Sequence, residues 1–190
     1  MVASLASGDD YRKLLFELEK KELEAPSGIA TAQVYEQMLA LLLLQNDLCN
    51  AKYLWKRIPP AIKSGSSELP HIWAVGQQMW KRDYPGVYQA LKREWADDLK
   101  QVMEAVAEAT KLRAIHLVAQ AYSSISVEDF AKFVGSLPEE AIGVAVQEGW
   151  VEDSASGMIV PKKPATPSTP IKPNEEQLAK LTEFVSFLEN

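Results

Sequence analysis

The residue types that most often carry catalysis or bind metal ions are sparse in this sequence. The 190 residues include two histidines, His71 and His116, and one cysteine, Cys49. The histidines lie far apart in the chain and belong to neither an H-x-H nor an H-E-x-x-H pattern, so they form no zinc-binding motif. Cys49 has no histidine near it in the sequence, and we expect it to be a small core residue. We therefore predict no metal, no cofactor and no catalytic centre, and we expect that the protein is not an enzyme.

A second pattern could bind nucleic acid. Trp-Lys-Arg occurs at residues 55–57 and again at residues 80–82, with further aromatic residues between and just beyond. Aromatic rings beside basic side chains can stack on the bases of single-stranded RNA, so an RNA-binding adaptor is one hypothesis. The alternative, which we favour, is that the rings fill contacts between helices. The lysine and arginine side chains would then point to solvent or to an acidic partner.

The overall composition argues against two further classes of binding. The chain carries 26 acidic and 20 basic residues, and a net charge of −6 disfavours a general binder of nucleic acid or of anionic membranes. The longest apolar run, residues 38–44, is far shorter than the roughly 20 residues of a membrane helix. The N-terminal residues lack the pattern of a secretory signal, and a single cysteine suits a reducing compartment. We expect no membrane association, and a location in the nucleus and cytoplasm.

Helical periodicity dominates the first half of the chain. Asp47 and Asp83 each precede a helical segment, and Lys56 and Arg57 in the first segment correspond to Lys92 and Arg93 in the second, 36 positions later. Because this offset is close to the period of helix-turn-helix solenoids, we predict a short stack of helical hairpins of the TPR or HEAT kind over residues 1–107. The segment 97–122 should form one long or one broken helix.

The pattern changes after Ile125 and predicts a winged-helix domain over residues 108–162. Ser126 and Gly135 should cap and end one short helix, and Ser136 and Gly149 should do the same for the next. Two short strands in a hairpin follow, within residues 150–153 and 158–161. Three helices followed by a two-stranded wing is the order of this fold.

The second short helix of this domain would be the one to enter a DNA groove. It carries Glu139, Glu140 and Glu148 and no lysine or arginine. Because carboxylates repel the phosphate backbone, the domain is expected to bind protein and not nucleic acid.

The C-terminal segment combines a proline-rich linker with an amphipathic helix. Residues 161–173 have a proline at every third position, which favours an extended polyproline II rod of about 40 Å. Residues 174–190 form the expected helix, which Asn174 could cap. Its large apolar residues recur at helical spacing and number too many for a solvated tail. We predict either that this helix folds back on its own domain or that it reaches a helix bundle shared with other chains. The predicted partner-binding residues of the helix are Leu178, Leu181, Phe184, Val185, Phe187 and Leu188.

Three segments of the sequence resemble a known family. They are "AKYLWKRIPPAIK" at 51–63, "AQAYSSISVEDFAKFVG" at 119–135 and "LAKLTEFVSFLEN" at 178–190. Together with the order of helical repeat and winged helix, they resemble the PCI family of subunits in the proteasome lid, the COP9 signalosome and translation initiation factor three. The likeness covers nearly the whole chain and is greatest for the signalosome branch.

This resemblance implies a mainly α fold and a non-catalytic scaffold role in the signalosome, which removes a ubiquitin-like modifier from cullin subunits of ubiquitin ligases. PCI subunits associate through their winged-helix sheets and pool their C-terminal helices in one bundle, so the implied partners are other PCI subunits in a hetero-oligomer. A PCI subunit of the proteasome lid or of the initiation factor is the alternative. The residues expected at the edge of the winged-helix sheet are Trp150, Val151, Met158 and Ile159.

Overall fold

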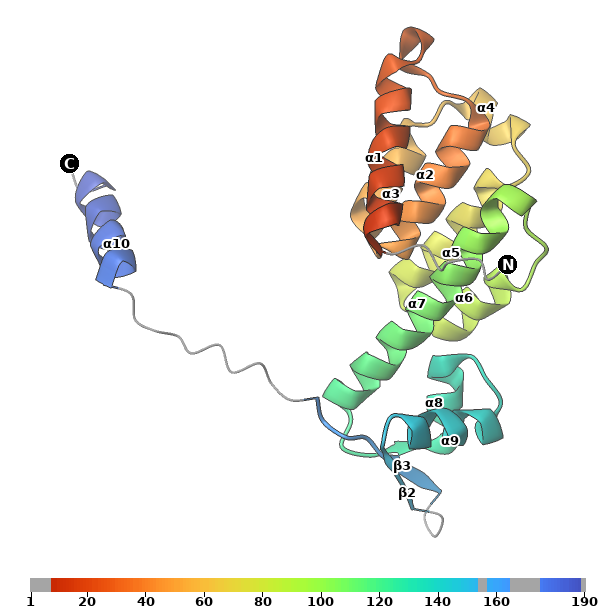
Figure 1. Ribbon diagram of the computed structural model, residues 1–190, viewed down its shortest axis with the longest axis vertical. Coiled ribbons are helices and arrows are strands. Elements are labelled where there is room, and N and C mark those ends of the chain that lie inside the picture. Colours follow the sequence, from red (N-terminus) through yellow and green to blue (C-terminus); the bar gives the residue numbers. More distant parts are fainter. Residues whose placement is uncertain (1–7, 154–156, 165–174, 189–190) are drawn as a thin grey trace.

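The described residues of the computed structural model, 8–153, 157–164 and 175–188, form a helical stack, a winged helix and a separate C-terminal helix (Figure 1). The predicted fold class, mainly α with a small sheet, is confirmed. The helices of the stack are connected by short turns, as expected for helical hairpins. They are α1 (Gly8–Glu24), the 3-10 turn η1 (Pro26–Gly28), α2 (Ala32–Leu44), α3 (Leu48–Arg57), α4 (Pro60–Gly65), α5 (Leu69–Lys81) and α6 (Tyr84–Leu91).

Two turns of the stack have the same local structure, 36 positions apart. Asn46 after α2 and Arg82 after α5 both adopt left-handed backbone conformations, with φ of 60° and 61°. The next residue in each turn caps the following helix: the Asp47 carboxylate accepts from the Asn50 amide at 3.0 Å, and Asp83 accepts from Gly86 at 3.1 Å. The repeat predicted from the sequence therefore exists as a repeated helix, left-handed turn and aspartate cap.

Helix α2 lies at the centre of the stack. Its apolar residues extend around most of the helix, and Tyr35 and residues 38–43 are buried. Helices α1, α3, α5 and α7 (Asp97–Ala121) pack around it. An all-round apolar helix needs neighbours on several sides, and the short hairpins supply them.

The long helix α7 contributes to two separate cores. Leu99 to Val106 pack into the stack, whereas Ile115 to Ala119 pack into the winged helix. The segment 97–122 is therefore one helix and not two. The domain boundary predicted between residues 107 and 108 falls within this continuous helix, where one core gives way to the other, and it stays a prediction.

The winged helix contains one strand that the sequence did not reveal. A two-residue strand, β1, pairs antiparallel with β3, which also pairs with β2, so the sheet order is β1-β3-β2. The hairpin was expected to consist of two edge strands, but β3 is the middle strand of the described sheet. A two-residue strand has too few residues to show an alternating pattern. The elements are β1 (Ile125–Ser126), α8 (Val127–Val134), α9 (Pro138–Gln147), β2 (Val151–Asp153) and β3 (Met158–Val160).

The two short helices of this domain begin differently: a side chain caps the first, and no side chain caps the second. Ser126 caps α8 as predicted, accepting from the Asp129 amide at 3.1 Å, and Gly135 ends it with φ of 71°. The predicted cap Ser136 is wrong, because Leu137 occupies the N-cap position of α9 and makes no side-chain cap. Pro138 begins the helix where its fixed φ suits the first turn. Ser136 Oγ is instead buried and has no hydrogen-bond partner in the described structure.

Aromatic residues join the stack to the winged helix. The Tyr88 hydroxyl of α6 donates to the Phe133 carbonyl of α8 at 3.0 Å, and the Tyr84 ring lies 5.3 Å from the Phe133 ring. Gly135 lies against the Tyr88 ring, where a Cβ atom would clash. Together with continuous α7, this contact fixes the winged helix against the stack.

Helix α10 (Glu175–Leu188), drawn in blue in Figure 1, lies apart from the stack and the winged helix. The predicted polyproline rod and the predicted cap Asn174 fall mostly outside the described residues, which include only 161–164 of that segment. Among the helices that the structure describes, none is both long enough and apolar enough to cross a membrane.

Candidate protein-interaction surfaces

The apolar face of α10 is the largest uncovered apolar feature of a single described helix. The six residues predicted to bind partners there are all exposed, by 50% to 79% of their surface. Helical spacing places most of them along one side of α10, with Phe187 widening the face. Because exposed apolar residues gathered on one face mark interaction sites, this face is a candidate contact surface.

The sheet of the winged helix offers a narrower candidate surface. Val151 of β2 is 65% exposed, and β2 is an outer strand. Trp150 and Ile159 are buried, and the Trp150 ring packs 5.1 Å from Phe130 in the domain core. Met158 is half-buried on the middle strand β3. A partner at this edge would contact the β2 backbone and Val151, whereas the buried Trp150 and Ile159 hold the edge in place. The binding roles of Val151, Met158, Trp150 and Ile159 stay predictions.

The exposed surface of α9 is acidic and partly apolar. Glu139 and Glu140 are exposed to solvent, as are Leu137 and Val146, an exposure that the sequence pattern does not reveal. The nearby Lys132 on α8 pairs with Asp129 at 2.9 Å, and hydrogen bonds from Lys132 and Ser126 lower the pKa of the Asp129 carboxyl. Because the surface offers carboxylates, it is unsuited to a phosphate backbone.

The residues with catalytic or metal-binding chemistry are scattered. His71 Nδ1 lies 2.7 Å from the Ser67 carbonyl, and His116 Nε2 lies 2.9 Å from the Gln120 amide nitrogen. Across residues 8–153, 157–164 and 175–188, no three His, Cys, Asp or Glu side chains cluster as metal ligands would. Cys49 is exposed on α3, so the expectation of a core residue is wrong. Cys49 lies in the first turn of α3, on the side that faces solvent, and sequence spacing alone did not reveal this orientation.

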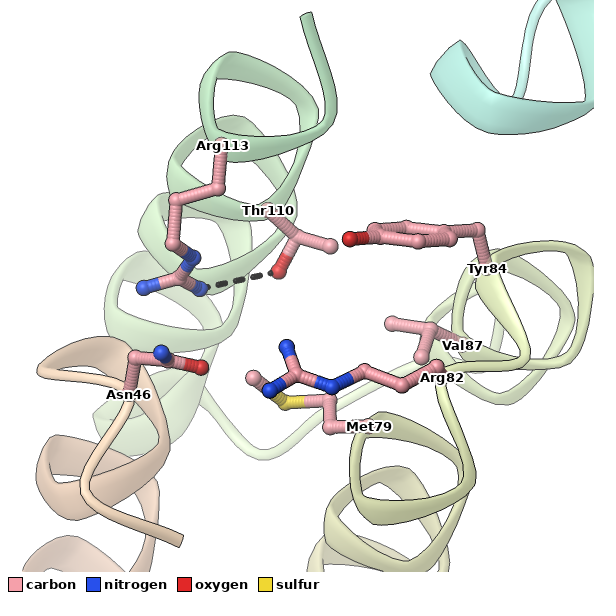
Figure 2. A pocket seen from close by; sticks show the side chains of 7 residues that line it. All are labelled: Asn46, Met79, Arg82, Tyr84, Val87, Thr110 and Arg113. Carbon is pink, nitrogen blue, oxygen red and sulfur yellow. Dashed lines mark hydrogen bonds between the residues drawn. The ribbon is translucent and has the colours of Figure 1, made fainter. Parts of the chain in front are cut away.

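A small cavity lies where the two repeated turns meet α7 (Figure 2). Its volume is about 40 Å³, and its lining includes Arg82 and Arg113 but no carboxylate. Arg113 donates to the Leu44 carbonyl at the end of α2 and to Thr110 Oγ1, both at 3.1 Å. Burial lowers the pKa of the Arg113 guanidinium. The arginine thus caps α2 and fastens it to α7, a structural role.

The tryptophan of the first triplet, Trp55 on α3, packs against Trp73 on α5. Trp55 and Trp73 stack with ring centroids 5.4 Å apart and an interplanar angle of 10°. Both rings are half-buried and pack against the core, so the favoured interpretation holds for the first triplet. Trp80 remains 48% exposed.

Comparison with known proteins adds to this picture. A family model described as the CSN8/PSMD8/EIF3K family matches residues 29–169. The chain is 56% identical over 181 residues to COP9 signalosome complex subunit 8 of Xenopus laevis, a match that covers 95% of this chain and 93% of the relative. It is 56% identical to the protein of the same name from Danio rerio, over 94% of each chain. It is 37% identical to that from Arabidopsis thaliana, over 76% of this chain and 74% of the relative. The helical stack, the winged helix and these matches together show that the chain belongs to the CSN8/PSMD8/EIF3K family.

Proposed function

We propose that the protein is a non-catalytic scaffold subunit of a COP9 signalosome. In this role it supports removal of a ubiquitin-like modifier from cullin-RING ubiquitin ligases through protein-protein contacts. The observation that carries the proposal is the 56% identity, over nearly the full length of both chains, to proteins named as subunit 8 of that complex.

Two surfaces would supply the contacts with other PCI subunits in the hetero-oligomer. The exposed face of α10 would join a bundle of C-terminal helices, and the outer side of β2 would pair with a strand of a neighbour. Burying a large apolar side chain is worth about 1.5–3 kcal/mol, so six such residues on α10 offer a substantial driving force for assembly. An outer strand presents backbone groups that a neighbouring strand can satisfy.

The proposed role places the chemistry in another subunit. The two histidines are exposed, distant in sequence and bonded to a carbonyl and an amide, so they do not resemble a hydrolytic centre. The purified chain should therefore leave cullin conjugates intact, and deneddylation by the chain alone would refute the proposal. The proposal also includes residence in nucleus and cytoplasm, which cell fractionation tests.

Affinity purification of the tagged chain from cell extract, followed by mass spectrometry, tests the assignment to a complex. Recovery of the other signalosome subunits in near-equal amounts is the expected result. Recovery of proteasome lid subunits or of initiation factor three would overturn the proposal in favour of another branch of the family.

A variant of α10 tests the contact surface. Leu181→Asp with Val185→Asp places two charges on the apolar face and should release the chain from the complex, because an unpaired charge is costly to bury. The matched control, Ala179→Asp with Ser186→Asp, adds the same charge on the other side of the helix and should still assemble. Normal assembly of the first variant would show that α10 is dispensable.

A further inference from the structure

Positive charge is concentrated on three consecutive helices of this acidic protein. Between Leu48 and Arg82 the sequence holds six lysines and arginines but a single acidic residue, Glu68. The helices α3, α4 and α5 contain no aspartate or glutamate. The whole chain has a net charge of −6, so this region differs sharply from its surroundings.

Most of these cations have no carboxylate partner. Arg57 pairs with Glu22 of α1 at 2.6 Å, and Glu68 itself pairs with Arg93 at 3.5 Å. Within the part of the chain that the structure describes, the remaining lysines of α3, α4 and α5 form no ion pair. They are Lys52, Lys56, Lys63 and Lys81.

Tryptophan rings hold two of these lysines in place. Lys52 Nζ lies 4.5 Å from the centre of the Trp80 ring, and Lys63 Nζ lies 4.9 Å from that of Trp55. Such cation–π contacts restrict otherwise mobile side chains while leaving the ammonium hydrogens able to bind an acceptor. The two ammonium groups are therefore partly fixed before any partner arrives, which reduces the entropy cost of binding.

The surrounding side chains complete a surface with an apolar component. Tyr53 is 65% exposed, and Lys56 lies one helical turn beyond Lys52 on the same side of α3. Lys81 follows the half-exposed Trp80 at the end of α5. We name this region the α3–α5 basic surface, which comprises Lys52, Tyr53, Lys56, Lys63, Trp80 and Lys81.

We propose that the α3–α5 basic surface binds an acidic segment of another protein. Four unpaired ammonium groups match a run of carboxylates, and the exposed parts of Tyr53 and Trp80 match an apolar or aromatic residue within that run. The surface lies on elements other than α10 and β2, so this inference is independent of the proposed assembly contacts.

Nucleic acid fits the same surface less well, because the faces of the tryptophan rings are already in contact with other side chains. Trp55 and Trp73 stack on each other, and Lys52 covers the Trp80 ring, so these rings are poorly placed to stack on bases. A long polyanion would also extend beyond the surface and meet the acidic remainder of the protein. A short acidic peptide would feel mainly the local positive charge, since salt screens charges more than about 10 Å away.

A binding assay with the full chain tests the proposal. The probes are three fluorescent ligands: a peptide of about 12 residues of glutamate and phenylalanine, the same peptide with glutamine for glutamate, and an oligouridine of similar length. Fluorescence anisotropy at about 100 mM salt should show the acidic peptide binding at least about tenfold more tightly than either of the others. Equal binding of the glutamine peptide, or tighter binding of the RNA, would overturn the proposal.

Charge-reversal variants locate the binding. Lys56→Glu with Lys81→Glu leaves both cation–π contacts intact and should weaken the acidic peptide at least about tenfold. The control, Lys13→Glu with Lys100→Glu, changes the net charge equally on α1 and α7 and should weaken it less than about twofold. Equal loss in both variants would indicate a non-specific charge effect and refute the proposal.

The single cysteine gives an independent readout of location. Cys49 is exposed on α3, one turn before Lys52 and Tyr53. Bound acidic peptide should slow alkylation of Cys49 by a neutral reagent in the native chain and in the Lys13 and Lys100 control, but not in the Lys56 and Lys81 variant. Undiminished alkylation at saturating peptide would place the peptide elsewhere. If the native chain self-associates and the Lys56 and Lys81 variant does not, the surface binds a second copy of the chain. That result would overturn the proposal.

Discussion

Helices α2 and α10 have similar lengths and are both rich in large apolar residues, yet their surroundings are opposite. Residues 38–43 of α2 are at most 5% exposed, whereas the six large apolar residues of α10 are at least half exposed. In α2 the apolar residues lie on nearly all sides, but in α10 they form a face. The difference shows that apolar periodicity predicts which side chains must be buried, but not which molecule buries them. An apolar face can be left exposed by its own chain and be buried by a partner.

The two helices also differ in how much the burial of their apolar side chains stabilises the folded chain. The apolar surface of α2 stabilises the folded chain itself. The apolar surface of α10 contributes little to the stability of the described structure, and its free energy of burial of about 1.5–3 kcal/mol per residue is still available for binding. Four tests compare buried, joining and exposed positions through the stability of the folded chain, in order of decreasing expected effect.

Truncation of one leucine in each helix gives the sharpest contrast. Leu41→Ala in α2 should lower the free energy of unfolding by about 2–5 kcal/mol, because it leaves a cavity at a fully buried position. Leu181→Ala in α10 removes the same atoms from an exposed position and should change it by less than about 0.5 kcal/mol. Urea denaturation of both variants measures the difference. Similar losses in the two would mean that α10 is part of the folded core.

The contact between α6 and α8 lies between these extremes. Gly135→Ala combines a left-handed backbone with a clash against the Tyr88 ring and should cost about 2–3 kcal/mol. Gly149→Ala has a similar φ of 73° but open space around the new Cβ atom, so it should cost only about 1 kcal/mol. Thermal unfolding of both variants separates the clash from the backbone strain. Equal losses would show that the Tyr88 contact adds nothing.

Removal of the Tyr88 hydroxyl should have a smaller, pH-dependent effect. Tyr88→Phe loses the hydrogen bond to Phe133 and should lower stability by about 1 kcal/mol at neutral pH. Burial, aided by the neighbouring Tyr84, raises the pKa of Tyr88 well above its ordinary value of 10.0. The unfolded chain therefore loses this proton at a lower pH than the folded chain does, so stability falls as the pH rises above about 10.

Denaturation curves of the native protein and the Phe variant between neutral pH and about pH 11 test this linkage. The native protein should lose more stability over this range than the variant, since only Tyr88 differs between them. A parallel decline would show that the hydroxyl ionises equally well in the folded state.

The smallest effect on folding is expected for the α10 variant that should abolish assembly. Leu181→Asp with Val185→Asp should change the stability of the isolated chain by less than about 0.5 kcal/mol, because both side chains are already solvated. Differential scanning calorimetry of the isolated chain provides the measurement. A large fall in the unfolding temperature would show that α10 folds back on its own body in solution.

Local rules predicted much of the fold. The helix starts at Asp47 and Asp83, the serine cap at Ser126 and the glycine stop at Gly135 each depend on groups within a few residues, and the structure has them all. The apolar spacing of α10 likewise predicted an amphipathic helix, but it left open whether the chain covers that face itself. These features could be predicted because their physical causes lie close together in the chain.

Features that depend on distant residues were missed. β1 exists because Ile125 and Ser126 lie beside Ile159 and Met158, and its two residues carry no strand signal. The burial of Trp150 depends on Phe130 across the domain core. Lys52 of α3 lies over the Trp80 ring of α5, a contact between two helices that the triplet pattern does not show.

The sequence by itself determined which segments are helices, where several of them begin and end, and that no catalytic motif is present in its residues. Only the tertiary structure decided which apolar surfaces the chain covers for itself, which strand lies in the middle of the sheet, and which cations remain without a carboxylate. The physical reason is the range of the interactions. Capping and helical periodicity act within one or two turns, whereas burial, strand pairing and charge pairing join residues that the sequence keeps far apart.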